Sequence, residues 1–194
     1  MSYFLSASDQ FIPVNTEKAQ VYGAEFEMRK NFGFIGGDNW EDFSFNLNFS
    51  LIHSELEMSE AEYERRLLSA RDGEKISDTR EMPGQSPYLI NFGLNYANED
   101  NGWQTSLYYN VQGKTLQVVG TGDVPDAYTI PFNSLDFILN KSFGKESSSN
   151  ISLSVKNLLD SQREVRYQSF GAEDQIFSSF TPGTGISLGY TYRF

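Results

Sequence analysis

The chain has 194 residues, 39% of them hydrophobic, and a mean hydropathy of −0.46; a soluble protein and a β-barrel share such values, because only alternate strand residues of a barrel face lipid. Lys and Arg number 15 against 26 Asp and Glu, and the net charge of −11 excludes a nucleic-acid partner, which needs a basic surface. The absence of cysteine excludes disulfides and thiolate metal sites, and no apolar run is long enough for a transmembrane helix.

Aromatic residues are abundant and the N-terminus is not a secretory signal. The 11 Tyr, 16 Phe and 2 Trp make up 15% of the chain, which favours a barrel with an apolar band and aromatic girdles. Residues 1–8 contain neither the basic region nor the apolar stretch of a signal peptide. An outer-membrane location therefore requires a signal upstream of this sequence.

The dominant pattern along the chain is strict alternation of apolar and polar residues, which is typical of β-strands with two different faces. Segments with this pattern occur, in chain order, at 22–29, 43–51, 88–96, 103–111, 135–140, 151–156 and 186–194. In the second of them the apolar phase is Phe43, Phe45, Leu47, Phe49 and Leu51. We predict about seven strands, with residues Tyr3 to Phe11 as the top of an eighth.

Charge is distributed unequally between the two phases of these segments. The apolar phase carries no charge, whereas the polar phase carries Glu, Asp, Lys and Arg freely. A Lys or Arg on the lipid face of a barrel costs about 2–4 kcal/mol near the midplane, so a lipid-facing phase should exclude charge. The inner face of a soluble β-sandwich excludes it too, and that alternative stays open at this stage.

Strand and connection lengths favour the membrane. Several segments alternate over about ten residues, the length that a tilted membrane strand requires. Short turns at 98–102 and 143–149 and a medium turn at 32–42 alternate with long loops at 58–86, 114–126 and 168–182. The sequence predicts an all-β fold, an antiparallel up-and-down transmembrane β-barrel segment of about 7–8 strands with short periplasmic turns and long extracellular loops.

The longest loop contains a helix signal and several cationic residues. Ser59 to Glu62 forms a capping-box pattern before residues 63–70, and Gly73 is a possible helix end. Four arginines of this loop could contact a ligand or simply keep the loop soluble: Arg65, Arg66, Arg71 and Arg80.

Four motifs, in order, resemble the C-terminal barrel of TonB-dependent outer-membrane receptors, particularly those of Bacteroidetes. Residues 15–27 are similar to the pattern N-x-x-x-A-x-V-x-G-x-E-x-E, and residues 84–94 to G-Q-S-P-Y-x-x-N-x-G-L. Residues 157–160, Asn-Leu-Leu-Asp, resemble the family's N-L-F-D with Leu159 in place of Phe. The final strand after Pro182 and Gly183 resembles the terminal strand of the family.

The resemblance implies that residues 1–194 are the C-terminal part of a receptor barrel, with neither plug nor signal peptide, in the outer membrane of a Gram-negative bacterium. It implies energy-coupled uptake of a large nutrient, such as an iron chelate, a corrinoid or a glycan. The implied partners are outer-membrane lipid, the missing strands and plug of the same receptor, the TonB complex acting through that plug, and the barrel assembly machinery. The last of these would read a C-terminal signal formed by Tyr190, Tyr192 and Phe194.

Ligand contacts are expected from loop residues and upper lumen residues, namely Arg80, Tyr108, Asn110 and Gln112. No enzymatic activity, cofactor or metal site is predicted, because a triad would have to use the one histidine, His53, which falls on the apolar phase at a strand end. Gly23 and Gly93 fall on the polar phase, where a plug could approach closely. Two other functions stay open: a self-contained small outer-membrane barrel acting as adhesin or anchor, and a soluble β-sandwich binding module.

Overall fold

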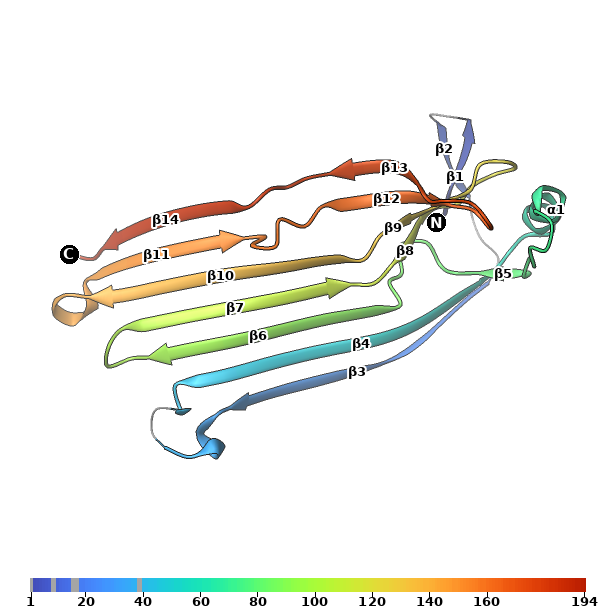
Figure 1. Cartoon of the computed structure of the whole chain (residues 1–194). Helices are drawn as coiled ribbons and strands as arrows, with labels where there is room; N and C mark the ends of the chain where they lie inside the picture. Colours follow the sequence, from blue (N-terminus) through green and yellow to red (C-terminus); the bar gives the residue numbers. More distant parts are fainter. Residues whose placement is uncertain (1, 8–9, 15–17, 38–39) are drawn as a thin grey trace.

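The structure is a computed structural model that describes residues 2–7, 10–14, 18–37 and 40–194. Its largest sheet is an antiparallel meander in which each strand pairs with its neighbours along the chain (Figure 1). From one edge to the other the strands are β3 (Ala19–Asn31), β4 (Phe43–Glu57), β6 (Tyr88–Asn98), β7 (Trp103–Gln112), β10 (Phe132–Phe143), β11 (Ser149–Lys156) and β14 (Gly185–Tyr192). The short strand β5 (Thr79–Arg80) is added beside the upper end of β4.

The strand register places each alternating phase on one face of this sheet. Phe49 of β4 lies between Phe26 of β3 and Ile90 of β6, so their apolar side chains share what we call the apolar face. On the opposite, polar face, Asn48 Nδ2 donates to Glu25 Oε1 at 2.7 Å. The predicted strands and the predicted alternation are confirmed.

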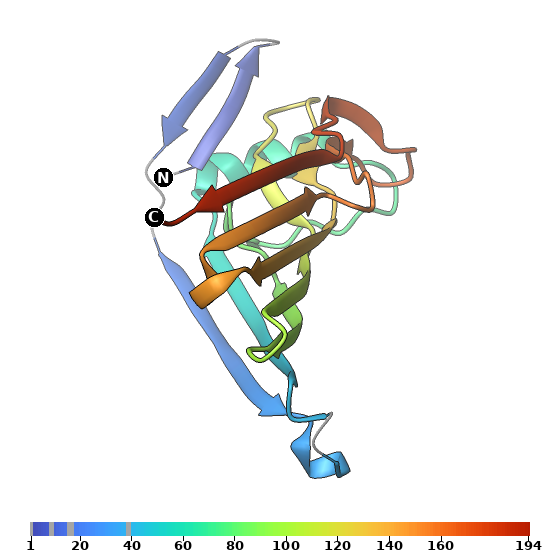
Figure 2. The same ribbon diagram turned by 90° about the vertical axis from the view of Figure 1, so that its left-hand side faces the viewer.

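The apolar face is open, and Figure 2 shows the sheet as one curved layer. Large apolar side chains are more than half exposed on both edge strands: 53% for Phe26 of β3 and 75% for Leu188 of β14. A soluble β-sandwich would cover this face with a second sheet. Within the described ranges no such layer exists, so the structure does not support the sandwich alternative.

We call the two ends of the sheet the short-turn end and the long-loop end. At the long-loop end four strands form a second antiparallel sheet: β8 (Thr115–Val118), β9 (Asp126–Thr129), β12 (Arg163–Gln168) and β13 (Gln175–Phe180). Each of them extends the line of a main-sheet strand beyond a short non-strand segment, β8 from β7, β9 from β10, β12 from β11 and β13 from β14, as Figure 1 shows. The regions predicted as the loops 114–126 and 168–182 therefore contain strand as well as loop: β8 and the first residue of β9 lie in the first region, and the last residue of β12 and all of β13 lie in the second.

The buried hydrophobic residues also gather at the long-loop end. They form two small clusters in the second sheet, one around Ala127 and one around Val119, both fully buried. Alternation in the sequence did not reveal these strands. Each is only four to six residues long and is separated from the main-sheet strand beside it in the chain by a non-strand segment. The main sheet has almost no core of its own.

The long loop after β4 contains the predicted helix, α1 (Glu60–Ser69). Ser59 is its N-cap and accepts a hydrogen bond from the Glu62 backbone N–H at 3.3 Å, as the capping-box pattern predicted. The helix ends at Ser69, with Ala70 as its C-cap, rather than at Gly73, which adopts a left-handed φ of +83° in the following turn. Two single-turn 3₁₀ helices lie in turns between main-sheet strands, η1 (Gly33–Ile35) in the medium turn and η3 (Lys145–Ser147) in a short turn.

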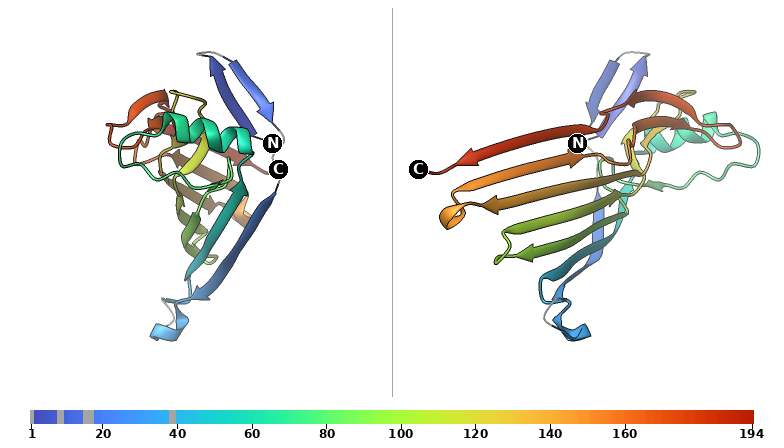
Figure 3. Two further views of the ribbon diagram at one scale, coloured as in Figure 1. Left: turned by 90° about the vertical axis from the view of Figure 1, so that its right-hand side faces the viewer. Right: turned by 60° about the vertical axis from the view of Figure 1, so that its left-hand side comes forward.

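The N-terminal residues do not form an eighth strand of the main sheet. β1 (Ser2–Ala7) and β2 (Gln10–Val14) pair with each other in a separate hairpin, which stands apart from the main sheet in Figure 3. Their six and five residues fall short of the about nine that a tilted membrane strand requires. The expectation that residues Tyr3 to Phe11 form the top of an eighth strand was wrong for those of them that the structure describes, 3–7 and 10–11.

No helix in the described part of the chain is both long and apolar enough to cross a membrane.

Candidate functional site

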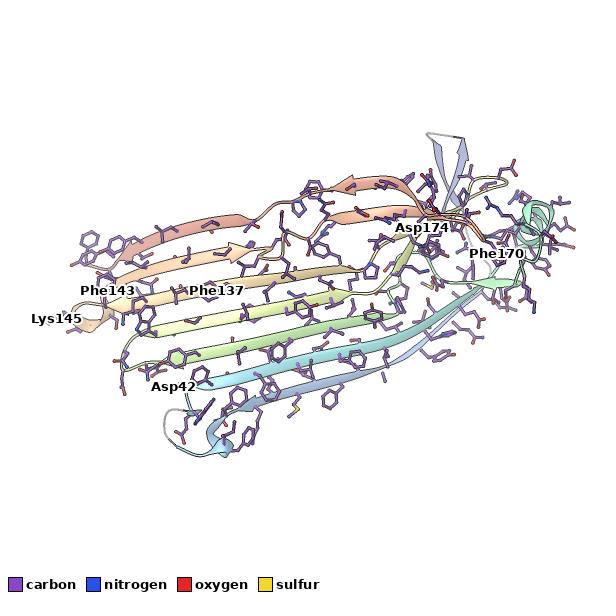
Figure 4. All side chains as sticks on the ribbon, in the orientation of Figure 1. Asp42, Phe137, Phe143, Lys145, Phe170 and Asp174 are labelled. Carbon is purple, nitrogen blue, oxygen red and sulfur yellow. The ribbon has the colours of Figure 1, made fainter. Side chains whose placement is uncertain are left out.

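The candidate site is a cavity of about 230 Å³ at the long-loop end. It lies between α1 with the loop that follows it, the tip of the β8–β9 hairpin and the tip of the β12–β13 hairpin, near the labelled Phe170 in Figure 4. Polar and charged side chains contribute most of its lining, together with one aromatic ring. The lining residues used below are Arg66, Arg71, Glu74, Asp123, Asp126 and Phe170.

Arg66 of α1 joins the helix to the β8–β9 hairpin. Its guanidinium donates to both carboxylate oxygens of Asp126, at 2.8 and 3.1 Å, and its Nε lies 3.6 Å from Glu62. Burial alone would lower the pKa of Arg66, but the hydrogen bonds and negative charge of Asp126, with the charge of Glu62, outweigh it and raise the pKa. The side chain remains a fixed cation at the cavity wall.

Glu62 is the buried centre of this network. Its side chain is 6% exposed and accepts a 2.8 Å hydrogen bond from Nε of Arg80, whose side chain is also 6% exposed. Arg80 thereby holds β5 against α1. Tyr128 of β9 faces the same charges, and burial together with the carboxylates of Asp126 and Glu81 raises its pKa, so its hydroxyl stays protonated.

Two hydrogen bonds of Arg71 complete the cavity. Arg71 Nη1 donates to the backbone carbonyl of Phe170 at 3.0 Å, which links the loop after α1 to the β12–β13 hairpin. The Phe170 ring is 51% exposed beside this contact. Glu74 caps the Arg71 backbone N–H at 2.9 Å. Guanidinium groups, carboxylates and an exposed aromatic ring therefore surround one cavity. This lining suits a polar ligand that carries hydrogen-bond donors and acceptors on its surface.

The structure does not gather the four residues predicted to contact ligand. Arg80 is engaged with Glu62. Tyr108 and Asn110 lie on the polar face of β7, where the Tyr108 hydroxyl donates to Asn95 Oδ1 at 3.3 Å and Asn110 Nδ2 donates to Ser134 Oγ at 3.4 Å.

Gln112 lines a different cavity, of about 520 Å³, where the main sheet meets the second sheet. None of the four lines the 230 Å³ cavity. Among the residues that do, the loop arginines were the only ones that sequence reasoning singled out. Asp126 and Phe170 were missed, because only the pairing of β8 with β9 and of β12 with β13 brings them to α1.

No group of three or more His, Asp or Glu side chains within the described ranges is arranged to hold a metal ion.

Comparison with known families decides what kind of barrel this sheet belongs to. The family model for TonB dependent receptor-like β-barrels matches residues 2–158. The chain belongs to the TonB-dependent receptor β-barrel family. No curated protein and no solved structure matches it. The resemblance found in the four motifs is thereby confirmed at the level of the family, which is an outer-membrane family of receptors and transporters rather than of enzymes.

One family motif, at residues 84–94, joins the long loop to the sheet. Ser86 is buried, and its hydroxyl lies 2.9 Å from the Tyr88 carbonyl and 3.2 Å from the Gly113 carbonyl. Gly84 N–H donates to the Leu116 carbonyl at 2.8 Å. These contacts tie the loop to the point where β7 ends and β8 begins, so the motif has a structural role here.

Gly23 and Gly93 make room for neighbouring strands within the receptor barrel. A Cβ on Gly23 would lie 2.3 Å from the backbone oxygen of Leu51, and one on Gly93 would lie 2.4 Å from Oδ1 of Asn46. Asn46 in turn accepts a hydrogen bond from Asn95 Nδ2 at 3.2 Å. The close approach expected from a plug is made by β4, which accounts for both glycines without one.

The Asn-Leu-Leu-Asp motif interrupts a strand. It separates β11 from β12, and Asn157 has a left-handed φ of +54°. The buried Asn157 amide donates to the carbonyls of Ser161 and Gly183, at 3.2 and 3.1 Å, and its Oδ1 accepts from Ser161 N–H at 3.0 Å. The Asn157 side chain thus holds two neighbouring interruptions together, the one between β11 and β12 and the one between β13 and β14.

Replacing Asn157 by alanine is expected to destabilise the folded barrel by about 2 kcal/mol, because three hydrogen bonds are lost and buried backbone groups lose their partners. Asn157→Gly loses the same bonds but relieves the left-handed backbone, so it should cost about 1 kcal/mol less. Urea unfolding in detergent measures both values. Leu158→Ala, at an exposed neighbour, is the control; an equal loss there would contradict a specific role for Asn157.

The three residues of the predicted assembly signal lie at the free edge of the sheet. Tyr190 and Tyr192 point to the apolar face of β14, and the Tyr190 hydroxyl lies 3.2 Å from Ser149 Oγ. The rings of Tyr192 and Phe194 meet edge to face, with centroids 5.1 Å apart. All three side chains are exposed.

Proposed function

We propose that this chain is the C-terminal part of the barrel of a TonB-dependent receptor, which takes up a large nutrient across the outer membrane of a Gram-negative bacterium. Membership of the family supports an outer-membrane receptor role. The observation that carries the proposal further is the main sheet itself: it has seven strands in its path, and each edge strand has a partner on one side only.

The strand directions support a larger barrel. β3 and β14 both run from the long-loop end to the short-turn end, because six antiparallel steps separate them. Joining these two edges directly would make a parallel pair, whether within one chain or between two copies. An up-and-down barrel is antiparallel throughout, so an odd number of further strands must lie between β14 and β3.

A self-contained small barrel fits the sheet less well. In lipid each unpaired backbone N–H or C=O group costs several kcal/mol, so neither edge can stay open in a membrane. The N-terminal hairpin cannot close the gap, because its strands are too short to cross. The missing wall therefore comes from other strands of the same receptor, and the plug that contacts TonB comes with them.

Ligand recognition is assigned to the long-loop end, which we place on the extracellular side. The 230 Å³ cavity there has two guanidinium groups, several carboxylates and the exposed Phe170 ring. Tyr108, Asn110 and Gln112 line the polar face below it, along the path that a ligand would take through the barrel. Iron chelates, corrinoids and glycans all present the polar groups that such a surface binds. Tyr190, Tyr192 and Phe194 are proposed as the signal read by the barrel assembly machinery.

Two experiments test this function. Residues 1–194 expressed alone should neither stay monomeric in water nor give a heat-modifiable band in detergent micelles; a soluble monomer, or a closed barrel, would contradict the proposal. In the bacterium, deleting the coding segment should abolish growth on one nutrient among siderophores, corrinoids and glycans. Deleting the gene for TonB should abolish growth on the same nutrient, and growth that persists there would count against energy-coupled uptake.

A further inference from the structure

Charged side chains on the apolar face occur only at its two ends. At the short-turn end the face carries Lys30 of β3 and Lys141 of β10. At the long-loop end it carries Glu55 and Glu57 of β4, with Lys18 lying 3.7 Å from Glu57. Among the described residues of the seven strands, every position of this face between the two ends is uncharged.

The distance between these ends matches a membrane. Phe43 and His53 lie ten residue steps apart on the apolar face of β4, about 34 Å along the strand. If the strand is tilted by about 40°, this length covers about 26 Å along the membrane normal. The apolar band of an outer-membrane barrel has nearly the same height, about 25 Å. At the upper limit the His53 ring contacts the Tyr22 ring, with centroids 4.8 Å apart and ring planes tilted by 37°.

Both lysines lie against aromatic rings at the lower limit of this band. Lys141 Nζ is 4.6 Å from the centroid of the Trp103 ring and donates to the Asn101 carbonyl. Lys30 Nζ is 5.7 Å from the centroid of the Phe34 ring. A lysine with this geometry keeps its alkyl chain along an apolar surface and its ammonium at the interface.

Neither ammonium is neutralised within the described part of the protein. No carboxylate lies within 4.0 Å of Lys30 or Lys141, although acidic residues are present in the neighbouring short turns. Each ammonium therefore keeps donors that can bind an anion. Glu57, at the other end, has a lysine partner.

From this arrangement we propose that Lys30 and Lys141 bind the phosphate groups of phospholipid headgroups in the periplasmic leaflet and hold the sheet at its depth in the membrane. The inference rests on the proposed outer-membrane location, with the short-turn end facing the periplasm. Phospholipid is the phosphate source at that level, and the lysines share the interface with Trp103 and Phe34, whose rings pack against acyl chains and glycerol.

Native mass spectrometry of the full-length receptor, purified from outer membranes in a mild detergent, tests the inference. The protein is titrated with phosphatidylglycerol and, separately, with zwitterionic phosphatidylcholine. Each lysine near the surface is expected to contribute about fivefold to the affinity for the anionic lipid. Lys30→Gln and Lys141→Gln should each weaken phosphatidylglycerol binding by that factor, and Lys141→Arg should retain it.

Lys156→Gln is the matched control, because Lys156 lies on the polar face of β11. It should leave lipid binding unchanged. Unchanged phosphatidylglycerol binding in Lys30→Gln and Lys141→Gln, or an equal loss in Lys156→Gln, would overturn the inference while leaving the receptor role intact. A wild-type protein that stays soluble without detergent would instead overturn the membrane location on which both depend.

Discussion

Replacing Glu62 by alanine is expected to detach α1 from the second sheet, with a loss of about 3–5 kcal/mol in the free energy of opening this region. Glu62 is the carboxylate between Arg80 and Arg66, and the side chains of Glu62 and Arg80 are almost fully buried. Without it, the buried Arg80 loses its 2.8 Å ion pair with Glu62. Hydrogen exchange of the α1 amides in the detergent-solubilised receptor measures the change, and trypsin cleavage at Arg65 and Arg71 reports it independently.

Two further variants separate the ion pair from a general effect on the helix. Glu60→Ala changes another acidic residue in the first turn of α1, but an exposed one, and should leave exchange nearly unchanged. The double variant Glu62→Leu/Arg80→Met replaces the pair by apolar side chains of similar volume and should recover much of the lost protection. Slow exchange in Glu62→Ala itself would show that other contacts hold α1 in place.

Replacing Phe137 by arginine is expected to destabilise the barrel in detergent or lipid by about 2–4 kcal/mol, because the charge would face the middle of the apolar band. Phe137 lies half-way along β10 in Figure 4, between Leu107 of β7 and Val155 of β11. The heat-modifiable band of the full-length receptor and its level in the outer membrane should both fall. Urea unfolding of the purified variant gives the free-energy change.

The matched control places the same charge on the opposite face at the same depth. Ser154 of β11 is the direct neighbour of Val155 and lies opposite Ile138 on the polar face. Ser154→Arg should therefore be tolerated within about 1 kcal/mol, since a lumen-facing arginine keeps its water. Equal destabilisation by the two arginines would contradict the assignment of the apolar face to lipid.

The sequence by itself determined the main sheet. Alternation at 43–51 and 88–96 was sufficient, because a β-strand turns successive side chains to opposite faces and a one-residue slip would invert them all. The short turns followed from where alternation stops. The family was also accessible from four short motifs, since each motif is a short run of residues that can be compared without knowledge of the distant residues that it contacts.

Only the tertiary structure decided what lies at the long-loop end. The strands β8, β9, β12 and β13 are short, and the two hairpins that they form are joined into one sheet by the pairing of β9 with β12, which lie far apart in sequence and whose contact no local pattern encodes. The same pairing brings Asp126 and Phe170 to Arg66 and Arg71, and it engages Arg80 with Glu62 instead of a ligand. Side chains that a sequence presents as equivalent loop charges thus acquire different roles, because burial and partners are properties of the assembled fold.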